Sequence, residues 1–350
     1  MVGESYLADC TKQTLLEDDI WKRLIPFVGT GFTANIHKDA TVQAVINDCA
    51  RGSFAGVGNL LEKCDGDSPR AFDFLIWKLS EQKRFSGEKL LDCYREGKKA
   101  LYANIQTFLH NIGVHGETPN KDNKNWEQHF ALLNCYNEII TTNWENSLES
   151  AGHALNLCCY SYYSANGELF RERVGEETKN PLDERTIIKL HGHLVNDERG
   201  PYSIVASETD YYHRVRRSDP LDDDILCRLS AKGLLFIGYS LSDVNVRYVL
   251  KQVNTVNKYF ERDQKSYLVI AEPTPDDTGD KLSLLYSQFL KDHANITVCP
   301  LIKWTPDDNE QWKKAEKRKE DWFANRQDKI RKAWSELFYA IKEKQKRRRQ

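Results

Sequence analysis

The chain has the sequence Leu-Ile-Pro-Phe-Val-Gly-Thr-Gly-Phe-Thr at residues 24–33. Five apolar residues followed by two glycines predict a buried strand that ends in a tight turn, with a helix starting just after it. Glycines let backbone N–H groups approach a pyrophosphate, and a helix N-terminus favours negative charge. A plain turn is the alternative, since such glycine pairs are common. The predicted ligand contacts here are Gly29, Thr30, Gly31, Phe32 and Thr33.

Similar apolar segments recur along the chain, and each ends at a polar or glycine-containing turn. Further strands are expected at residues 138–142, 186–190 and 234–238, followed by possible strands at 266–271 and 296–298 and a helix at 243–253. Strands alternating with helices are typical of a parallel sheet covered on both faces. The predicted fold is therefore α/β, a Rossmann-like, doubly wound parallel sheet.

Two segments depart from this pattern. Residues 54–130 have apolar residues at helical spacing and no strand-like runs, which predicts an inserted helical subdomain; crossover helices of the main sheet are the weaker alternative. Residues 301–350 form a basic C-terminal helical segment, where Ile330, Trp334, Leu337 and Ile341 make an apolar stripe that must pack on something. The catalytic domain is predicted at 1–53 and 131–300.

Composition fits an ordinary soluble protein. Of the 350 residues, 40% are apolar and 29% charged, and neither a membrane span nor a signal peptide is apparent, so the expected location is cytoplasmic. Nine scattered cysteines suggest buried thiols in a reducing compartment, without a disulfide framework or a zinc site. The segment 313–350 has 15 Lys or Arg against 6 Asp or Glu, a net charge of +9 in a chain of −2.

The turn after the second strand contains Thr142 and Asn143. Open α/β sheets bind ligands at the carboxyl ends of their strands. A carboxamide there can both donate to and accept from a ribose hydroxyl or a water. Capping of a helix from Trp144 onward by Thr142 or Asn143 is the simpler alternative.

The turn after the third strand carries His191-Gly192-His193. An imidazole at a strand end titrates near neutrality and suits general base work. A single histidine is more often structural, and His193 is assigned that role.

The fourth turn supplies Gly238, Ser240 and Asp243. Gly238 permits close approach of a ligand, and Ser240 offers a hydroxyl to a phosphate or ribose. Asp243 either contacts the ligand indirectly or caps the following helix.

In this order the four turns resemble the sirtuin-like (silent-information-regulator) superfamily, whose members have a Gly-Ala-Gly-x-Ser turn, a Thr-x-Asn-x-Asp motif, a catalytic His-Gly and a Gly-x-Ser turn. Asn143 and His191 match the motif Asn and the catalytic His, and Glu145 replaces the Asp. The zinc module of protein deacylases is missing, because Cys227 is the one cysteine between His191 and Gly238. The Gly-Ile-Pro-x-Phe-Arg loop is also missing. The remaining pattern is similar to sirtuin-like domains of prokaryotic antiphage systems.

That resemblance implies an NAD hydrolase, with NAD as substrate and no metal, that releases nicotinamide and ADP-ribose and starves an infected cell (abortive infection). Asn143 and His191 would be catalytic. It also implies gating, through a homo-oligomer or a partner such as a DNA-translocating ATPase or an Argonaute-type protein. Two alternatives stay open. One is a non-catalytic scaffold that binds NAD or ADP-ribose and contacts nucleic acid through the basic C-terminus; the other, less favoured, is protein deacylation.

Overall fold

The computed structural model of the chain describes most of its length. The described residues are 6–51, 59–81, 89–176, 180–195, 200–217, 219–229, 231–241, 243–262, 264–271, 281–303, 310, 314 and 326–347. Parts of the predicted helical insert, Ser242, most of 304–325 and residues 348–350 lie outside them.

In the described part of the chain, one eight-stranded sheet forms the centre, in the order β4-β3-β5-β2-β1-β6-β7-β8. The strands are β1 Leu24–Val28, β2 Glu138–Thr141, β3 Cys158–Ala165, β4 Glu168–Val174, β5 Glu184–Lys189, β6 Gly233–Ile237, β7 Ser266–Ile270 and β8 Ile296–Pro300. All neighbouring pairs are parallel except β3 and β4, which form an antiparallel hairpin at one edge. The predicted doubly wound, Rossmann-like sheet is confirmed.

The central strand β1 is buried on both faces. Ile25 and Phe27 belong to the apolar cluster on one side of the sheet, whereas Leu24 and Val28 belong to the cluster on the other. Because side chains alternate along a strand, a strand covered on both sides must be apolar at every position. This explains why it is an uninterrupted apolar run in the sequence.

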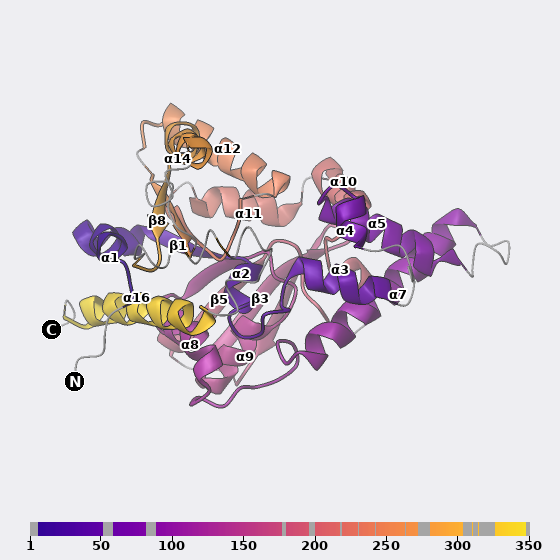
Figure 1. The fold of residues 1–350 in the computed structure, drawn as a ribbon, viewed down its shortest axis with the longest axis horizontal. Coiled ribbons are helices and arrows are strands. Elements are labelled where there is room, and N and C mark those ends of the chain that lie inside the picture. The colour runs from indigo at the N-terminus through magenta and orange to yellow at the C-terminus, as the bar shows by residue number, and fades with distance from the viewer. Residues whose placement is uncertain are drawn as a thin grey trace.

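Helices cover the two faces as separate layers (Figure 1). The helices of the first layer are α1 Asp9–Leu16, α8 Glu127–Cys135, α9 Ser147–Ala154 and α16 Gln327–Arg347, and those of the second are α11 Pro220–Leu229, α12 Val244–Tyr259 and α14 Lys281–Ala294. The predicted apolar stripe of α16 is confirmed, since Ile330, Trp334, Leu337 and Ile341 are all buried in the first cluster. The helix lies next to α8, where Cys135 Sγ donates to the carbonyl of Phe338 at 2.8 Å. The apolar face of the C-terminal helix is thus used within the chain's own core.

A third apolar cluster holds the helical region beside the sheet. It joins α3 Val42–Arg51, α4 Leu60–Lys63, α5 Ser68–Leu79 and α7 Leu90–Asn111, together with Leu194, Ile204 and Ala206 from the segment after β5. A helical unit is therefore present where one was predicted. The cluster also takes in α3, which precedes residue 54, so the domain boundaries stay a prediction.

The structure departs from the sequence-based expectations in a few places. The hairpin of β3 and β4 was not predicted; its strands are partly exposed and carry few aliphatic residues. The expected helix at Trp144 begins instead at Ser147. Cys10 and Cys227 are exposed, although all nine cysteines were expected to be buried. Among the described helices, none is both long and apolar enough to cross a membrane.

His129 is enclosed in the core against the rings of Phe32 and Trp126, and burial lowers its pKa to about 3. The unfolded chain, with an ordinary histidine pKa near 6.5, takes up a proton that the folded chain refuses, so stability falls as pH drops below about 6.5. We expect His129 to account for about 2 kcal/mol of the stability lost between pH 6.5 and pH 5. Urea unfolding of His129→Leu at both pH values should show a correspondingly smaller loss.

The matched control is His213→Leu, which alters an exposed histidine of α10 Glu208–Arg217. This variant should keep the pH dependence of the parent. An unchanged pH dependence in His129→Leu would contradict the prediction.

Candidate active site

The turns after β1 and β6 pack directly against each other. The N–H of Gly29 donates to Ile237 O at 2.9 Å, and that of Gly31 to Gly238 O at 3.0 Å. A Cβ at Gly29 would lie 2.5 Å from Gly238 O, and one at Gly238 would lie 2.2 Å from Phe32 N. These glycines are therefore needed for contact between two turns. The N–H groups of Gly29 and Gly31, expected to face a pyrophosphate, have backbone acceptors instead.

The β6 turn holds an unusual backbone conformation. Gly238 has φ of 58° and Leu241 has φ of 56°, both in the left-handed region. That region is unfavourable for leucine, and here the Leu241 side chain is buried in the second-layer cluster. Core packing thus fixes the turn that presents Ser240, which is exposed and lines the cleft described below.

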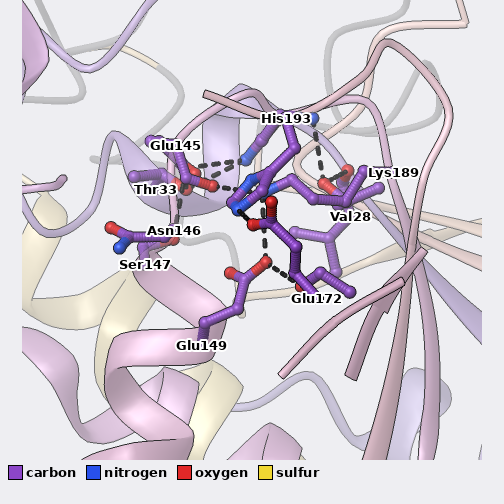
Figure 2. Close-up of polar contacts among 12 residues, drawn as sticks. Val28, Thr33, Glu145, Asn146, Ser147, Glu149, Glu172, Lys189 and His193 are labelled. Carbon is purple, nitrogen blue, oxygen red and sulfur yellow. Dashed lines mark hydrogen bonds and ion pairs between the residues drawn. The ribbon is translucent and has the colours of Figure 1, made fainter. Parts of the chain in front are cut away.

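The first two turns are joined through a buried acceptor, Glu145. Its Oε1 accepts from Thr33 Oγ1 at 2.7 Å, from Asn143 Nδ2 at 3.1 Å and from Ser147 Oγ at 3.1 Å. Figure 2 shows Glu145 beside Thr33 above the start of α9. Burial raises the pKa of Glu145. Glu145 thus ties the glycine turn to the Asn turn, a role that sequence comparison alone did not assign to it.

The side chain of Asn143 is held in one orientation by these contacts. Its Nδ2 donates to Thr33 Oγ1 at 3.0 Å as well as to Glu145, and its backbone N–H donates to Thr141 Oγ1 at 3.0 Å. Among the described residues, its buried Oδ1 has no hydrogen-bond partner. A buried acceptor without a donor is costly, which marks Oδ1 as a place where a ligand hydroxyl or a water can bind. The alternative of helix capping does not hold, because α9 starts beyond this turn.

The buried Lys189 connects the turn that contains Glu145 to helix α9. Lys189 Nζ donates to Glu145 O at 2.5 Å and to Glu149 Oε1 at 3.2 Å (Figure 2). Burial alone would raise the pKa of Glu149, but Lys189 holds it below its usual value. Breaking such a buried pair leaves an uncompensated charge. The sequence signal for this pair is Lys189 itself, a charged residue that directly follows the apolar residues Ile187 and Ile188 at the end of β5.

His193 lies close to this pair. Burial, reinforced by Lys189, lowers the pKa of His193 to about 3. Its Nε2 is 3.5 Å from Glu172 Oε2, and its ring packs against Tyr163. A neutral, enclosed imidazole is consistent with the structural role predicted for His193.

His191 is positioned differently. Its Nε2 lies 3.0 Å from Asp243 Oδ2, and its ring meets Tyr211 of α10 edge to face, with centroids 5.5 Å apart. Asp243 also accepts from Tyr211 Oη at 3.0 Å and from Val246 N at 3.2 Å. Burial alone would raise the pKa of Asp243, but hydrogen bonding with His191 holds it well below its usual range. The predicted helix cap at Asp243 is therefore present, together with a histidine contact that was not predicted.

One large cleft of about 2020 Å³ collects most of the predicted residues. The predicted site residues that line it are Thr30, Gly31, Thr142, Asn143, His191, Gly238, Ser240 and Asp243. Gly29 and Thr33 lie behind them, and the Phe32 side chain belongs to the core, where it contacts Trp334. Lining residues that were not predicted include Trp144, Tyr211 and Arg216. Parts of α3 and α5 form a further wall.

The described residues contain no cluster of three or more His, Cys, Asp or Glu side chains that could hold a metal ion. Polar turns at the carboxyl ends of β1, β2, β5 and β6 converge on one cleft instead. A parallel sheet with a cleft at this edge defines the Rossmann-like class of ligand-binding α/β domains.

Comparison with known proteins narrows this class. Residues 137–297 match the family model of the SIR2-like domain. The chain is also similar to Defense-associated sirtuin 2 of Bacillus subtilis, with 25% identity over 138 residues, or 39% of this chain and 12% of that protein. The predicted resemblance to sirtuin-like domains is confirmed. The segment that matches the family model, 137–297, includes the Asn143, His191 and Gly238 turns but not the first glycine turn.

Proposed function

We propose that this chain hydrolyses NAD at the bond between nicotinamide and ribose, giving nicotinamide and ADP-ribose. The observation that carries the proposal is the buried Oδ1 of Asn143, which has no partner among the described residues; Asn143 lines the same cleft as His191. The match to a SIR2-like domain supports NAD as the substrate. The similarity to a defence-associated sirtuin supports a role in defence. We propose that this defence is antiviral and acts through NAD depletion (abortive infection).

In the proposed reaction, Asn143 Oδ1 accepts a hydrogen bond from the nicotinamide ribose or from the attacking water. The C–N bond breaks with its electron pair moving to the cationic nicotinamide, which leaves as a neutral molecule. Water adds to the oxocarbenium-like anomeric carbon, and His191 accepts the proton that this water loses. The Gly31 and Gly238 turns and Ser240 would bind the rest of the dinucleotide.

The direct test is to incubate the purified chain with NAD in water enriched in ¹⁸O and to analyse the products by chromatography and mass spectrometry. We expect nicotinamide and linear ADP-ribose that carries one ¹⁸O atom. Cyclic ADP-ribose without the label would indicate attack by a group of the substrate itself. The proposal would be contradicted if NAD stayed unchanged with the chain alone and also after each candidate trigger was added.

The scaffold alternative rests on the basic C-terminus. In the described part of α16, Lys344 Nζ donates to Leu16 O and lies 3.8 Å from Asp19, and Lys346 pairs with Glu343. Lys344 is thus close to a carboxylate outside the basic segment, whereas the charge of Glu343 is already counted in the segment's net charge of +9. A fluorescent NAD analogue, assayed with and without DNA, separates binding from turnover.

We further propose that the enzyme is cytoplasmic and that its activity is gated, because unrestrained NAD hydrolysis would kill the host. A homo-oligomer, a DNA-translocating ATPase and an Argonaute-type protein are the candidate regulators. Exposed apolar side chains on α12 and α14, among them Tyr259 and Phe289, are compatible with such contacts.

A further inference from the structure

Three side chains from separate segments meet at one carboxylate beside the cleft. His191 follows β5, Tyr211 lies within α10, and Asp243 directly precedes α12. Asp243 Oδ2 is 3.0 Å from both His191 Nε2 and Tyr211 Oη. All three residues line the cleft.

We propose that Asp243 and Tyr211 are positioning residues that hold His191 in a single tautomer and ring orientation for NAD hydrolysis. The inference rests on the proposed function but is tested separately from it. It assigns Asp243 a role other than the ligand contact expected from the sequence.

The oxygens of Asp243 already have partners. Oδ1 accepts from the backbone N–H of Val246, which fixes the carboxylate at the start of α12. Oδ2 faces the imidazole, so it favours a proton on Nε2 and leaves Nδ1 as the nitrogen that can accept a proton. A carboxylate in this position also stabilises the imidazolium that forms when His191 takes up the proton.

Tyr211 fixes the second oxygen and the ring plane together. Its hydroxyl donates to Oδ2, and its ring meets the imidazole at an interplanar angle of 81°. Burial, and then the nearby Asp243, raise the pKa of Tyr211 well above its usual value, so the phenol keeps its proton and stays a donor. Removing this hydroxyl leaves the cavity shape almost intact.

The helix that carries Tyr211 is itself anchored on both sides. Arg214 donates to the carbonyl of Leu190, directly before His191, and pairs with Asp222 at 2.6 Å. At its N-terminal end, Thr209 Oγ1 donates to Asp73 of α5 at 3.2 Å, and Asp210 pairs with the buried Lys98 of α7. The position of Tyr211 is thus determined by contacts on both the sheet side and the helical side.

The charged and titratable groups around the three residues come from several elements. On α10, Asp210 raises the pKa of Tyr211 and Arg214 lowers it, in addition to the effect of burial. Burial and the nearby Asp243 raise the pKa of Tyr239, which follows β6, and Arg247 of α12 lowers it. Asp243 is the carboxylate in contact with His191, so a substitution there should dominate the pH response.

Two variants test the proposal. Asp243→Asn keeps the helix cap but can place an N–H opposite Nε2, which favours the wrong tautomer, so we expect kcat to fall about 100-fold. Tyr211→Phe removes one hydrogen bond to a charged group, and kcat should fall about tenfold. KM for NAD should change less than about twofold in both, since neither group is proposed to touch the substrate.

The pH profile separates positioning from general damage. Without the carboxylate charge, the acidic limb of kcat should move to lower pH in Asp243→Asn. Without the tyrosine hydrogen bond, Oδ2 interacts more strongly with the imidazole, so the limb should move to higher pH in Tyr211→Phe. Tyr248→Phe alters an exposed tyrosine of α12 that does not line the cleft, so it serves as the matched control and should leave both kcat and the profile unchanged.

A readout independent of activity keeps this inference distinct from the proposed function. NMR titration of the ¹⁵N-histidine-labelled protein, with the His191 signal assigned through His191→Gln, should show opposite shifts of the titration midpoint in the two variants. These shifts are expected even if the parent chain does not consume NAD, which would overturn only the proposed function. Unaltered midpoints, or a parental kcat in both variants of an active enzyme, would overturn the inference.

Discussion

Asn143→Ala is expected to lower the rate of NAD hydrolysis about 1000-fold without unfolding the protein. The substitution removes an acceptor that is already oriented before substrate binds, since Nδ2 is held by Thr33 and Glu145. The catalytic advantage of such a group comes from its fixed position, which costs no reorganisation during the reaction. Steady-state measurement of nicotinamide release gives the rate.

Asn143→Asp makes the test sharper, because it keeps an oxygen at the Oδ1 position. Its second oxygen would replace Nδ2, which lies 3.1 Å from Glu145 Oε1, so two acceptors would face each other. We therefore expect the aspartate variant to be as inactive as the alanine variant. Asn146→Ala is the control, because Asn146 accepts from Gly116 N and does not line the cleft. Parental activity in Asn143→Asp would show that the amide orientation is irrelevant.

Gly238→Ala should destabilise the fold by about 3 kcal/mol, because the added methyl group strains the backbone and also meets the backbone of the neighbouring turn. The residue has φ of 58°, and the new Cβ would lie 2.2 Å from the backbone N of Phe32. Backbone atoms cannot move aside as a flexible side chain can, so the two turns must separate. Thermal unfolding followed by tryptophan fluorescence measures the loss, and NAD binding should weaken with it.

Gly167→Ala separates backbone strain from the clash. Gly167 also has positive φ, at 82°, but an added Cβ would meet no atom within 4 Å. This variant should lose only about 1 kcal/mol, the cost of the left-handed conformation. Equal losses in the two variants would contradict steric contact between the turns.

The strands near the centre of the sheet could be predicted because burial on both faces requires apolar residues throughout. β1, β2, β5 and β6 were each found within two residues of their bounds in the structure. The hairpin of β3 and β4 could not be predicted in this way. β4 alternates between intermediate and exposed positions, and β3 contains tyrosines and serines rather than aliphatic residues.

The candidate site likewise contains residues that could be predicted from the sequence and residues that could not. Asn143 and His191 could be placed on the cleft from sequence, because carboxyl ends of parallel strands share one edge of the sheet. The partners that orient them could not. Glu145 contacts Asn143 because of the way the loop between them is folded. Tyr211 lies on a helix that only tertiary packing brings beside His191. The spacing of residues in the sequence does not predict the contact between Glu145 and Asn143 or the one between Tyr211 and His191.

The contact between the glycine turns has a consequence for searching genomes. Gly29 and Gly238 are required by the neighbouring backbone, whether or not a dinucleotide is bound. A descendant that had lost catalysis would therefore still need both glycines in order to fold, and a search based on them would retrieve active and inactive copies alike. A more discriminating filter would ask whether Asn143 still occurs with Glu145, and His191 with Asp243.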